Sequence, residues 1–224
     1  MNSAAESLWF LSPGLSHLLG NAVFAIQGRA QLLAADRSAA GAGPGLDAAG
    51  SASSVVGVAA DAEAILAGVE RARGALSVMR WLRDEVDEGE VADAHAVLAA
   101  VGEVARLPLR DRGYRLTWAE GGGVPLWVPP GAFCRLVVAA CRSLTEPVGP
   151  ALGGELRLTL AAAPDACLRL EVERNARAGV LPFGVESAAI ERELGPELAA
   201  LQGLVMHDRG GDQVALVMPQ ARQA

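Results

Sequence analysis

The chain has 224 residues, of which 51% are apolar, and this is enough to bury the core of one large domain or of two small ones. Its 19 basic residues are all arginine and are scattered among 26 acidic residues, which gives a formal charge of −7. This balance lacks the basic patch of a nucleic-acid-binding protein, so we predict no nucleic-acid partner. Charges or glycines interrupt each apolar stretch before it could span a bilayer, and Glu6 stands where a signal peptide carries cations. We therefore predict a cytoplasmic protein with no membrane partner.

The three cysteines do not form a metal or redox motif. Cys134 and Cys141 are spaced like neighbours on a helix, Cys167 lies in a strand-like segment, and the sequence has no CxxC pair or His/Cys cluster. We predict that all three are reduced and buried as small apolar side chains, and that the chain binds no metal.

The N-terminal part predicts a helical hairpin. A long first helix begins near Ser12 and Pro13, a suitable cap and first-turn pair, and a Ser3 to Glu6 capping box predicts helix before it. Residues 37–53 concentrate Gly, Ala and Ser, which predicts a flexible loop before the second helix.

Apolar residues recur three and four residues apart along both helices. These seams comprise Leu15, Leu19, Ala22, Ile26, Ala30 and Leu33 in the first helix, and Val55, Val58, Ala62, Ile65, Val69, Ala72, Leu76 and Met79 in the second. Such a pattern keeps one apolar stripe facing a partner over many turns. Two helices cannot enclose both seams, so we predict a homodimer in which two hairpins form a four-helix bundle.

The pattern changes after the polar run at residues 84–90. The elements predicted there are a helix at 91–112, strands at 114–118 and 126–128, a helix at 130–144, a hairpin of strands at 155–161 and 167–173, a helix at 187–202, and a final hairpin from 204 to 219. This order predicts helices packed on one face of a mainly antiparallel sheet. The fold class is therefore α+β, with a helical hairpin domain at 1–88 and an α/β sandwich domain at 89–224.

His17 is the strongest candidate for chemistry. It lies two residues from both Leu15 and Leu19, which at 100° per residue places it about half a turn from the apolar seam and facing solvent. Asn21 follows one turn later on the same stripe. An exposed imidazole nitrogen can attack phosphorus without first losing a proton of high pKa.

The run SHLLGNAVFAIQGRAQLL at residues 16–33 resembles the phospho-acceptor helix of sensor histidine kinases. Residues 63–83 resemble the second dimerisation helix of that family, and 91–219 follow the element order of its ATP-binding domain. The resemblance implies that His17 accepts a phosphoryl group and that Asn21 orients a water molecule or polarises the transfer site. Leu18 replaces the acidic residue that usually follows the histidine, so a general base for self-phosphorylation is missing.

The second domain departs from the family pattern at three places. The resemblance puts Ala139 and Ser143 where asparagines hold Mg²⁺ and phosphates, and Arg174 where an aspartate accepts a hydrogen bond from adenine. Residues 183–194 contain no glycine-rich lid for the phosphates. We therefore predict no ordinary ATP binding and no cofactor of the chain's own.

Three hypotheses follow from the resemblance. The first is a histidine phosphotransferase that carries a phosphoryl group on His17 between the aspartates of response-regulator receiver domains, with Mg²⁺ supplied on the receiver. The second is a pseudokinase scaffold that binds a signalling partner without phosphorylation of His17. The third, ranked last, is an active histidine kinase with a divergent nucleotide pocket.

Overall fold

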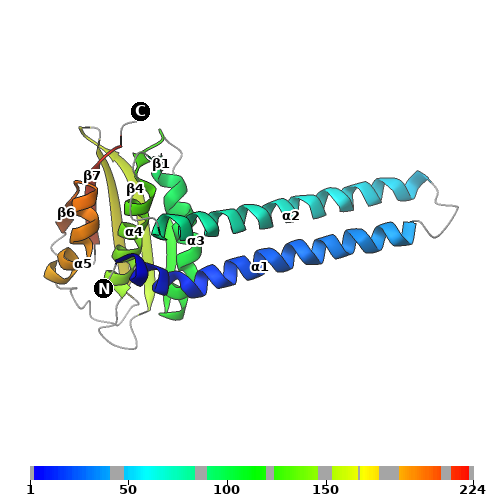
Figure 1. The fold of residues 1–224 in the computed structure, drawn as a ribbon, viewed down its shortest axis with the longest axis horizontal. Helices are drawn as coiled ribbons and strands as arrows, with labels where there is room; N and C mark the ends of the chain where they lie inside the picture. Colours follow the sequence, from blue (N-terminus) through cyan, green and yellow to red (C-terminus); the bar gives the residue numbers. More distant parts are fainter. Residues whose placement is uncertain are drawn as a thin grey trace. The chain divides into compact units, whose positions relative to one another are not determined.

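The computed structural model shows a chain of helices followed by a mixed α/β region, coloured in chain order in Figure 1. It describes residues 3–40, 48–83, 90–119, 124–145, 153–165, 167–176, 187–207 and 213–221. The elements are α1 (Ser3–Ala40), α2 (Ala48–Arg83), β1 (Ala92–Asp93), α3 (Ala94–Asp111), β2 (Tyr114–Trp118), β3 (Trp127–Val128), α4 (Pro130–Thr145), β4 (Gly154–Ala163), β5 (Cys167–Ala176), α5 (Ser187–Ala200), β6 (Leu204–His207) and β7 (Gln213–Pro219). The predicted α+β fold class is confirmed.

The chain divides into two compact units. The helical unit is Leu15–Leu76, and the sheet unit is Met1–Gly14 together with Ser77–Ala224. The predicted domain boundary between residues 88 and 89 lies outside the described residues. The predicted loop at 37–53 is wrong at both ends, because α1 continues to Ala40 and α2 begins at Ala48. The alanine and serine residues at the two ends of this segment are part of the helices, which agrees with the high helix propensity of alanine.

The helical unit packs through small residues. Ala22 of α1 is fully buried, and a Cβ added to Gly68 of α2 would lie 3.4 Å from Cγ1 of Ile26. That distance is an ordinary van der Waals contact, so small residues fit between the two helices at this point. Farther along the hairpin, Nη1 of Arg29 lies 2.7 Å from Oδ1 of Asp61, which ties α1 to α2 on its polar side.

Pro13 lies inside α1 and does not begin it, so the predicted helix start at Ser12 and Pro13 is wrong. Proline has no N–H to give to the carbonyl four residues earlier, which here belongs to Trp9. The Ser12 hydroxyl donates to that Trp9 carbonyl instead, at 3.0 Å. A side chain thus satisfies the acceptor that proline leaves open, and the helix continues.

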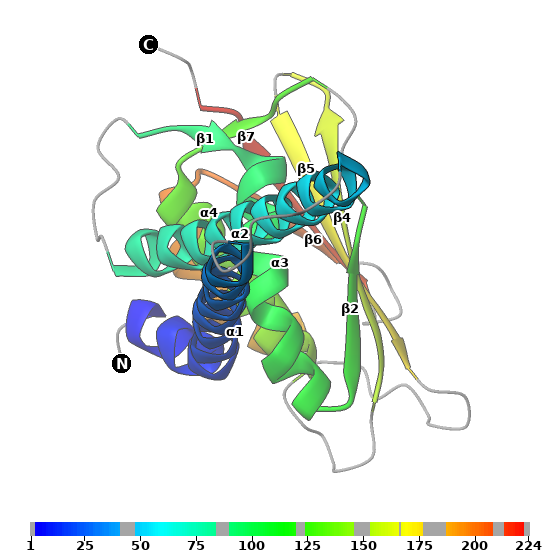
Figure 2. The same ribbon diagram turned by 90° about the vertical axis from the view of Figure 1, so that its right-hand side faces the viewer.

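The sheet unit contains a five-stranded sheet in the order β2-β4-β5-β7-β6. β2 and β4 are parallel and the other neighbours are antiparallel, so the prediction of a mainly antiparallel sheet is confirmed. Helices α3 and α4 pack against the sheet, and α5 packs against α4 (Figure 2). The largest fully buried side chains of this layer are Phe133, Leu98, Leu109, Leu136, Leu144, Leu156, Leu158, Leu168 and Leu170.

The start of α3 is fixed by Asp93, which shortens the predicted helix at 91–112. The Asp93 carboxylate accepts hydrogen bonds from the backbone N–H groups of His95 at 3.2 Å and of Leu126 at 3.3 Å. One side chain thus caps the helix and holds β3 beside β1, because a capping aspartate satisfies donors that the first helical turn leaves open. Ala92 pairs with Val128 in the two-stranded sheet, so it belongs to β1 and not to the helix.

A buried ion pair connects α4 and α5. Nε of Arg135 lies 2.9 Å from Oε2 of Glu197, and their side chains are only 13% and 7% exposed. Removing one partner of such a pair leaves a charge with poor access to water, so the pair fixes the position of α5 on α4.

Two of the three cysteines are buried in α4, and the third is not. Cys134 and Cys141 are buried, whereas Cys167 at the start of β5 is half-buried, so the prediction of three buried thiols is wrong for Cys167. All three are free thiols. Burial raises the pKa of the Cys141 thiol to about 12, because the protein interior disfavours the thiolate.

We expect Cys141 to resist alkylation in the folded protein and to make the protein less stable at high pH. Above pH 9 the unfolded chain binds fewer protons than the folded chain, so the free energy of unfolding falls as the pH rises from about 9 towards 12, by about 1.4 kcal/mol per pH unit for this group. Iodoacetamide labelling followed by mass spectrometry should modify Cys167 in the folded protein and Cys141 only in denaturant.

The control for the pH effect is Cys141→Ala, whose free energy of unfolding should fall less steeply between pH 9 and 10.5 in urea titrations. Equal slopes for the two proteins, or rapid labelling of Cys141 without denaturant, would contradict the assignment of a buried, protonated thiol.

Candidate functional site

His17 and Asn21 lie on the exposed surface of α1 within the helical unit. Both side chains are exposed, and the imidazole is accessible to solvent as its distance from the apolar seam predicts. The seam itself turns inward at Ala22, which is fully buried. The sequence therefore predicted the orientation of the ring correctly, while its chemical role stays a prediction.

The structure brings His17 and Asn21 into contact. Nδ2 of Asn21 lies 2.9 Å from Nε2 of His17, one helical turn away. An amide N–H only donates, so with the amide nitrogen facing the ring Nε2 is the acceptor and the ring proton belongs on Nδ1. This hydrogen bond favours the tautomer in which Nε2 holds the lone pair.

The helix surface around His17 is open within this unit. A Cβ added to Gly20 or Gly28 would meet nothing within 4 Å, and Phe24, two turns after His17, is 74% exposed. Offsets of three, seven and eleven residues place these positions on the same stripe as His17. The stripe thus combines an accessible imidazole, two positions without side chains and one exposed aromatic ring.

Among the described residues, no carboxylate supports the imidazole of His17. Among the described residues, Asn21 is the hydrogen-bond partner of His17, and no Asp or Glu bonds to it. The next residue, Leu18, has an apolar side chain that can neither accept a proton nor stabilise a charged imidazole. The arrangement therefore presents a nucleophile without an adjacent base.

The positions where the resemblance expects metal-binding asparagines are filled by packed side chains in α4. Ala139 is buried at 4% exposure, and Ser143 is buried and donates from its hydroxyl to the Ala139 carbonyl at 2.9 Å. The Ser143 oxygen is thus engaged within its own helix. Among the described residues, no group of three or more His, Cys, Asp or Glu side chains could hold a metal ion.

Arg174 lies in the row of inward-facing residues of β5. Alternation along the strand places it in register with Leu168, Leu170 and Val172, and it is only 5% exposed. Its Nη1 lies 3.4 Å from the carbonyl oxygen of Leu144, in the last turn of α4. A cation that donates to a C-terminal helix carbonyl is stabilised by the helix dipole, so Arg174 closes the end of α4.

The segment expected to lack a glycine-rich lid is only partly covered. Residues 177–186 lie outside the described residues, and α5 begins at Ser187. The prediction for residues 183–194 therefore stays a prediction.

In the part of the chain that the structure describes, no helix is long and apolar enough to cross a membrane.

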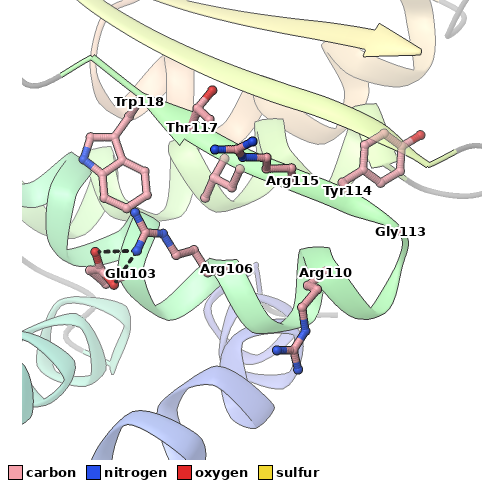
Figure 3. A pocket seen from close by; sticks show the side chains of 9 residues that line it. Glu103, Arg106, Arg110, Gly113, Tyr114, Arg115, Thr117 and Trp118 are labelled. Atoms are coloured by element: carbon pink, nitrogen blue, oxygen red, sulfur yellow. Dashed lines mark hydrogen bonds and ion pairs between the residues drawn. The ribbon is translucent and has the colours of Figure 1, made fainter. Parts of the chain in front are cut away.

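A groove between α3 and β2 was not predicted from the sequence (Figure 3). Its residues are Glu103, Arg106, Arg110, Gly113, Tyr114, Arg115, Leu116, Thr117 and Trp118. A signal was present, because Glu103, Arg106 and Arg110 recur three and four residues apart and so share one face of a helix. The pairing of that face with a sheet edge was not visible in the sequence.

No protein-family model matches the chain, and no curated protein matches it. Among solved structures, the chain is similar to the blue-light-activated histidine kinase EL346 of Erythrobacter litoralis, with 16% identity and a TM-score of 0.47 over 69% of this chain and 55% of that chain. It is also similar to full-length ShkA in complex with AMPPNP, with 17% identity and a TM-score of 0.46 over 98% of this chain and 45% of that chain.

A third similar structure is the histidine kinase AdeS of Acinetobacter baumannii, with 14% identity and a TM-score of 0.42 over 92% of this chain and 98% of that chain. The chain spans about half the length of the first two proteins. All three identities lie below 25% and all three TM-scores below 0.5, so these similarities say nothing about the activity, substrates or partners of this chain.

Proposed function

We propose that this chain is a histidine phosphotransfer protein of a two-component phosphorelay, in which His17 carries a phosphoryl group between receiver-domain aspartates. The observation that carries the proposal is the exposed imidazole of His17, with Asn21 hydrogen-bonded to its Nε2 at 2.9 Å. The resemblance of residues 16–33 to a phospho-acceptor helix supplies the chemical class, and the geometry on α1 supports it.

The transfer step needs only a nucleophile on this chain. The Asn21 amide first releases the Nε2 lone pair of His17, which then attacks the phosphorus of an aspartyl phosphate on the receiver. An N–P bond forms, and the P–O bond to the aspartate breaks. The electron pair of that bond leaves with the aspartate as a free carboxylate, and the proton on Nδ1 stays on the ring. The reverse reaction passes the group to the aspartate of a second receiver.

The surroundings of His17 support docking by a folded partner. Gly20 leaves room one turn from the imidazole, and Gly28 leaves the same stripe open about three turns away. The exposed Phe24 offers an apolar contact of the kind enriched at protein interfaces. The receiver would bring its own aspartate and Mg²⁺, and the metal ion would offset the charge of the phosphoryl group. The absence of a carboxylate next to His17 among the described residues favours transfer from a receiver over self-phosphorylation.

Arg174 supports the loss of ATP chemistry. An arginine cannot accept a hydrogen bond from the adenine amino group, and here it donates to the Leu144 carbonyl. Ser143 donates its hydroxyl hydrogen to the Ala139 carbonyl and is 7% exposed, so its oxygen is not presented at the surface of the sheet unit. These contacts fill, with the protein's own groups, the positions that the resemblance assigns to nucleotide and metal.

A homodimer accounts for the apolar residues that the hairpin leaves uncovered. Within the helical unit, the exposed apolar side chains other than Phe24 are Val23, Leu32, Leu66, Val69 and Leu76. The seam of α2 that was predicted to face a partner includes Val69 and Leu76, which are 43% and 56% exposed. A second hairpin packed on this seam would bury it and complete a four-helix bundle.

We expect His17 to take up a phosphoryl group from a phosphorylated receiver domain. Incubation with a ³²P-labelled receiver should give a label on the wild-type chain that is stable in alkali and lost in acid, as phosphohistidine is. His17→Ala should remove the label entirely. Asn21→Ala should slow the transfer about 10-fold, because one hydrogen bond that selects the reactive tautomer is lost.

The matched control is Glu70→Ala, an exposed residue of α2 in the same helical unit, which should label as fast as the wild type. Equal labelling of His17→Ala and wild type would refute the proposal. Absence of label on both proteins, while either still binds the receiver, would favour the scaffold hypothesis.

We expect Val69→Glu to separate the dimer into monomers. A carboxylate placed in the apolar seam of both copies would be buried without a partner, which should weaken dimerisation by about 100-fold or more. Size-exclusion chromatography with light scattering measures the mass. Ala67→Glu is the control, because this exposed position lies about half a turn from Val69. A wild-type chain that is monomeric would contradict the dimer.

We expect no ATP binding by the wild-type chain. Calorimetric titration with millimolar ATP and Mg²⁺ should give only heats of dilution, because the groups that would contact adenine and metal are replaced or engaged within the protein. The ATP-binding domain of a working histidine kinase, titrated in the same buffer, is the control. Saturable heat with the wild-type chain would instead favour the divergent-kinase hypothesis.

A further inference from the structure

The groove between α3 and β2 has a volume of about 700 Å³ and is formed entirely within the sheet unit. One wall is the face of α3 that carries Glu103, Arg106 and Arg110. The other wall is β2, all five residues of which line the groove (Figure 3). This groove plays no part in the proposed transfer through His17.

β2 is an edge strand with one side open. Within the described residues it pairs only with β4, through Tyr114–Trp118. The Ala119 N–H bonds to the Leu158 carbonyl and the Gly113 carbonyl accepts from Gly154, so the odd-numbered residues direct their backbone groups towards β4. The backbone groups of Tyr114, Leu116 and Trp118 therefore point to the open edge, because successive residues alternate. An open edge of this kind is a template for another strand.

Trp118 forms a firm platform at one end of the groove. Its ring packs so tightly on α3 that a Cβ added to Gly102 would lie 2.8 Å from two of its carbon atoms, so only glycine fits there. The guanidinium of Arg106 stacks 4.4 Å from the ring centroid. A cation over an aromatic face is held in place while its N–H donors remain available at the ring edge.

The groove is positively charged on a chain whose formal charge is −7. It carries three arginines and one glutamate. Glu103 pairs with Arg106 at 3.1 Å, and Asp111 lies 3.7 Å from Arg110. Arg115 on β2 is exposed and has no ion-pair partner among the described residues. The local excess of positive charge favours an anionic occupant.

The spacing of the arginines matches a strand better than a single small anion. Arg106 and Arg110 are four residues apart on α3, which separates them by about 6 Å along the helix axis. Alternate side chains of a strand are about 6.6 Å apart and lie on the same face. Two acidic residues at positions i and i+2 of an added strand would thus match the spacing of Arg106 and Arg110. The Arg110 guanidinium, which Figure 3 shows directed away from β2, would turn towards the strand on binding.

We propose that this groove binds an extended acidic peptide segment of a partner protein, which adds as a strand to the open edge of β2. Its backbone bonds to the outward N–H and C=O groups of Tyr114, Leu116 and Trp118. Its carboxylates at alternate positions pair with Arg106 and Arg110, on the face of the added strand that is turned towards α3 and Trp118. Backbone pairing supplies affinity in this mode, and the arginines select the acidic sequence.

The test uses a fluorescein-labelled peptide of eight residues that alternates glutamate and threonine, with fluorescence anisotropy on the full chain. We expect saturable binding that weakens as salt is raised. Arg106→Ala and Arg110→Ala should each weaken it about 10-fold, the value of one charge-assisted pair. Arg157→Ala, an exposed arginine of β4 outside the groove, is the matched control and should bind like the wild type.

Two altered peptides keep the test independent of the stability of any variant. A peptide with lysine in place of glutamate should not bind. N-methylation of alternate residues can be made in two registers, and the register that removes the N–H groups that pair with β2 should abolish binding. Binding of the lysine peptide, or full binding of both N-methylated registers, would overturn the proposal. Displacement of the peptide by an equal concentration of pyrophosphate would also overturn it, in favour of a small-anion site.

The outcome is separable from the phosphorelay proposal. His17→Ala keeps every residue of the groove, so it should bind the acidic peptide with wild-type affinity. Conversely, loss of peptide binding in Arg106→Ala should leave labelling of His17 by an isolated receiver domain that lacks an acidic extension unchanged.

Discussion

Two packed helices can shield only one stripe of apolar surface on each other, and this limit governs the helical unit. α1 and α2 meet through Ala22 and Gly68, small residues that fit between the two helices. Larger apolar side chains such as Leu66 and Val69 therefore remain exposed on a different face of the hairpin. His17 lies on neither the shielded stripe nor the seam of α2, so a second hairpin and a docking partner can use different surfaces. The proposed phospho-acceptor His17 and the proposed dimer interface are thus compatible in one helical hairpin.

The sheet unit contains a buried cation, Arg174, at a position that depends on the alternation of β5. The alternation that buries Leu170 and Val172 also directs Arg174 towards the end of α4, where its guanidinium donates to the Leu144 carbonyl. A helix C-terminus is a favourable place for a positive charge, and the bond satisfies a carbonyl that the helix leaves open. The same contact places donors where the resemblance expects an acceptor for adenine. One residue therefore closes the end of α4 and, under the proposed function, would also disfavour adenine binding.

Charge is distributed unevenly over this acidic chain. On the face of the sheet that carries Arg157, arginines alternate with glutamates and pair within 4.0 Å, which leaves little net field. The groove beside β2 differs, because Arg115 lacks such a partner among the described residues and Arg106 is held on Trp118. A local positive groove at a strand edge can select an acidic segment that the neighbouring, charge-paired surface does not attract. Partner choice and phosphoryl chemistry would then reside in separate units.

The sequence by itself determined the order of helices and strands, the α+β class and the outward orientation of His17, because these depend on local periodicity. It misplaced features that depend on a particular side-chain hydrogen bond or on the position of a strand end. Pro13 remains inside α1 because the Ser12 hydroxyl satisfies the Trp9 carbonyl, and Cys167 is partly exposed because it begins a strand. Only the tertiary structure decided the hydrogen bond from Asn21 to Nε2 of His17, the contact of Arg174 with Leu144, and the groove that joins α3 to the edge of β2. Rotamers and contacts between residues far apart in the chain set these features, and periodicity carries no information about either.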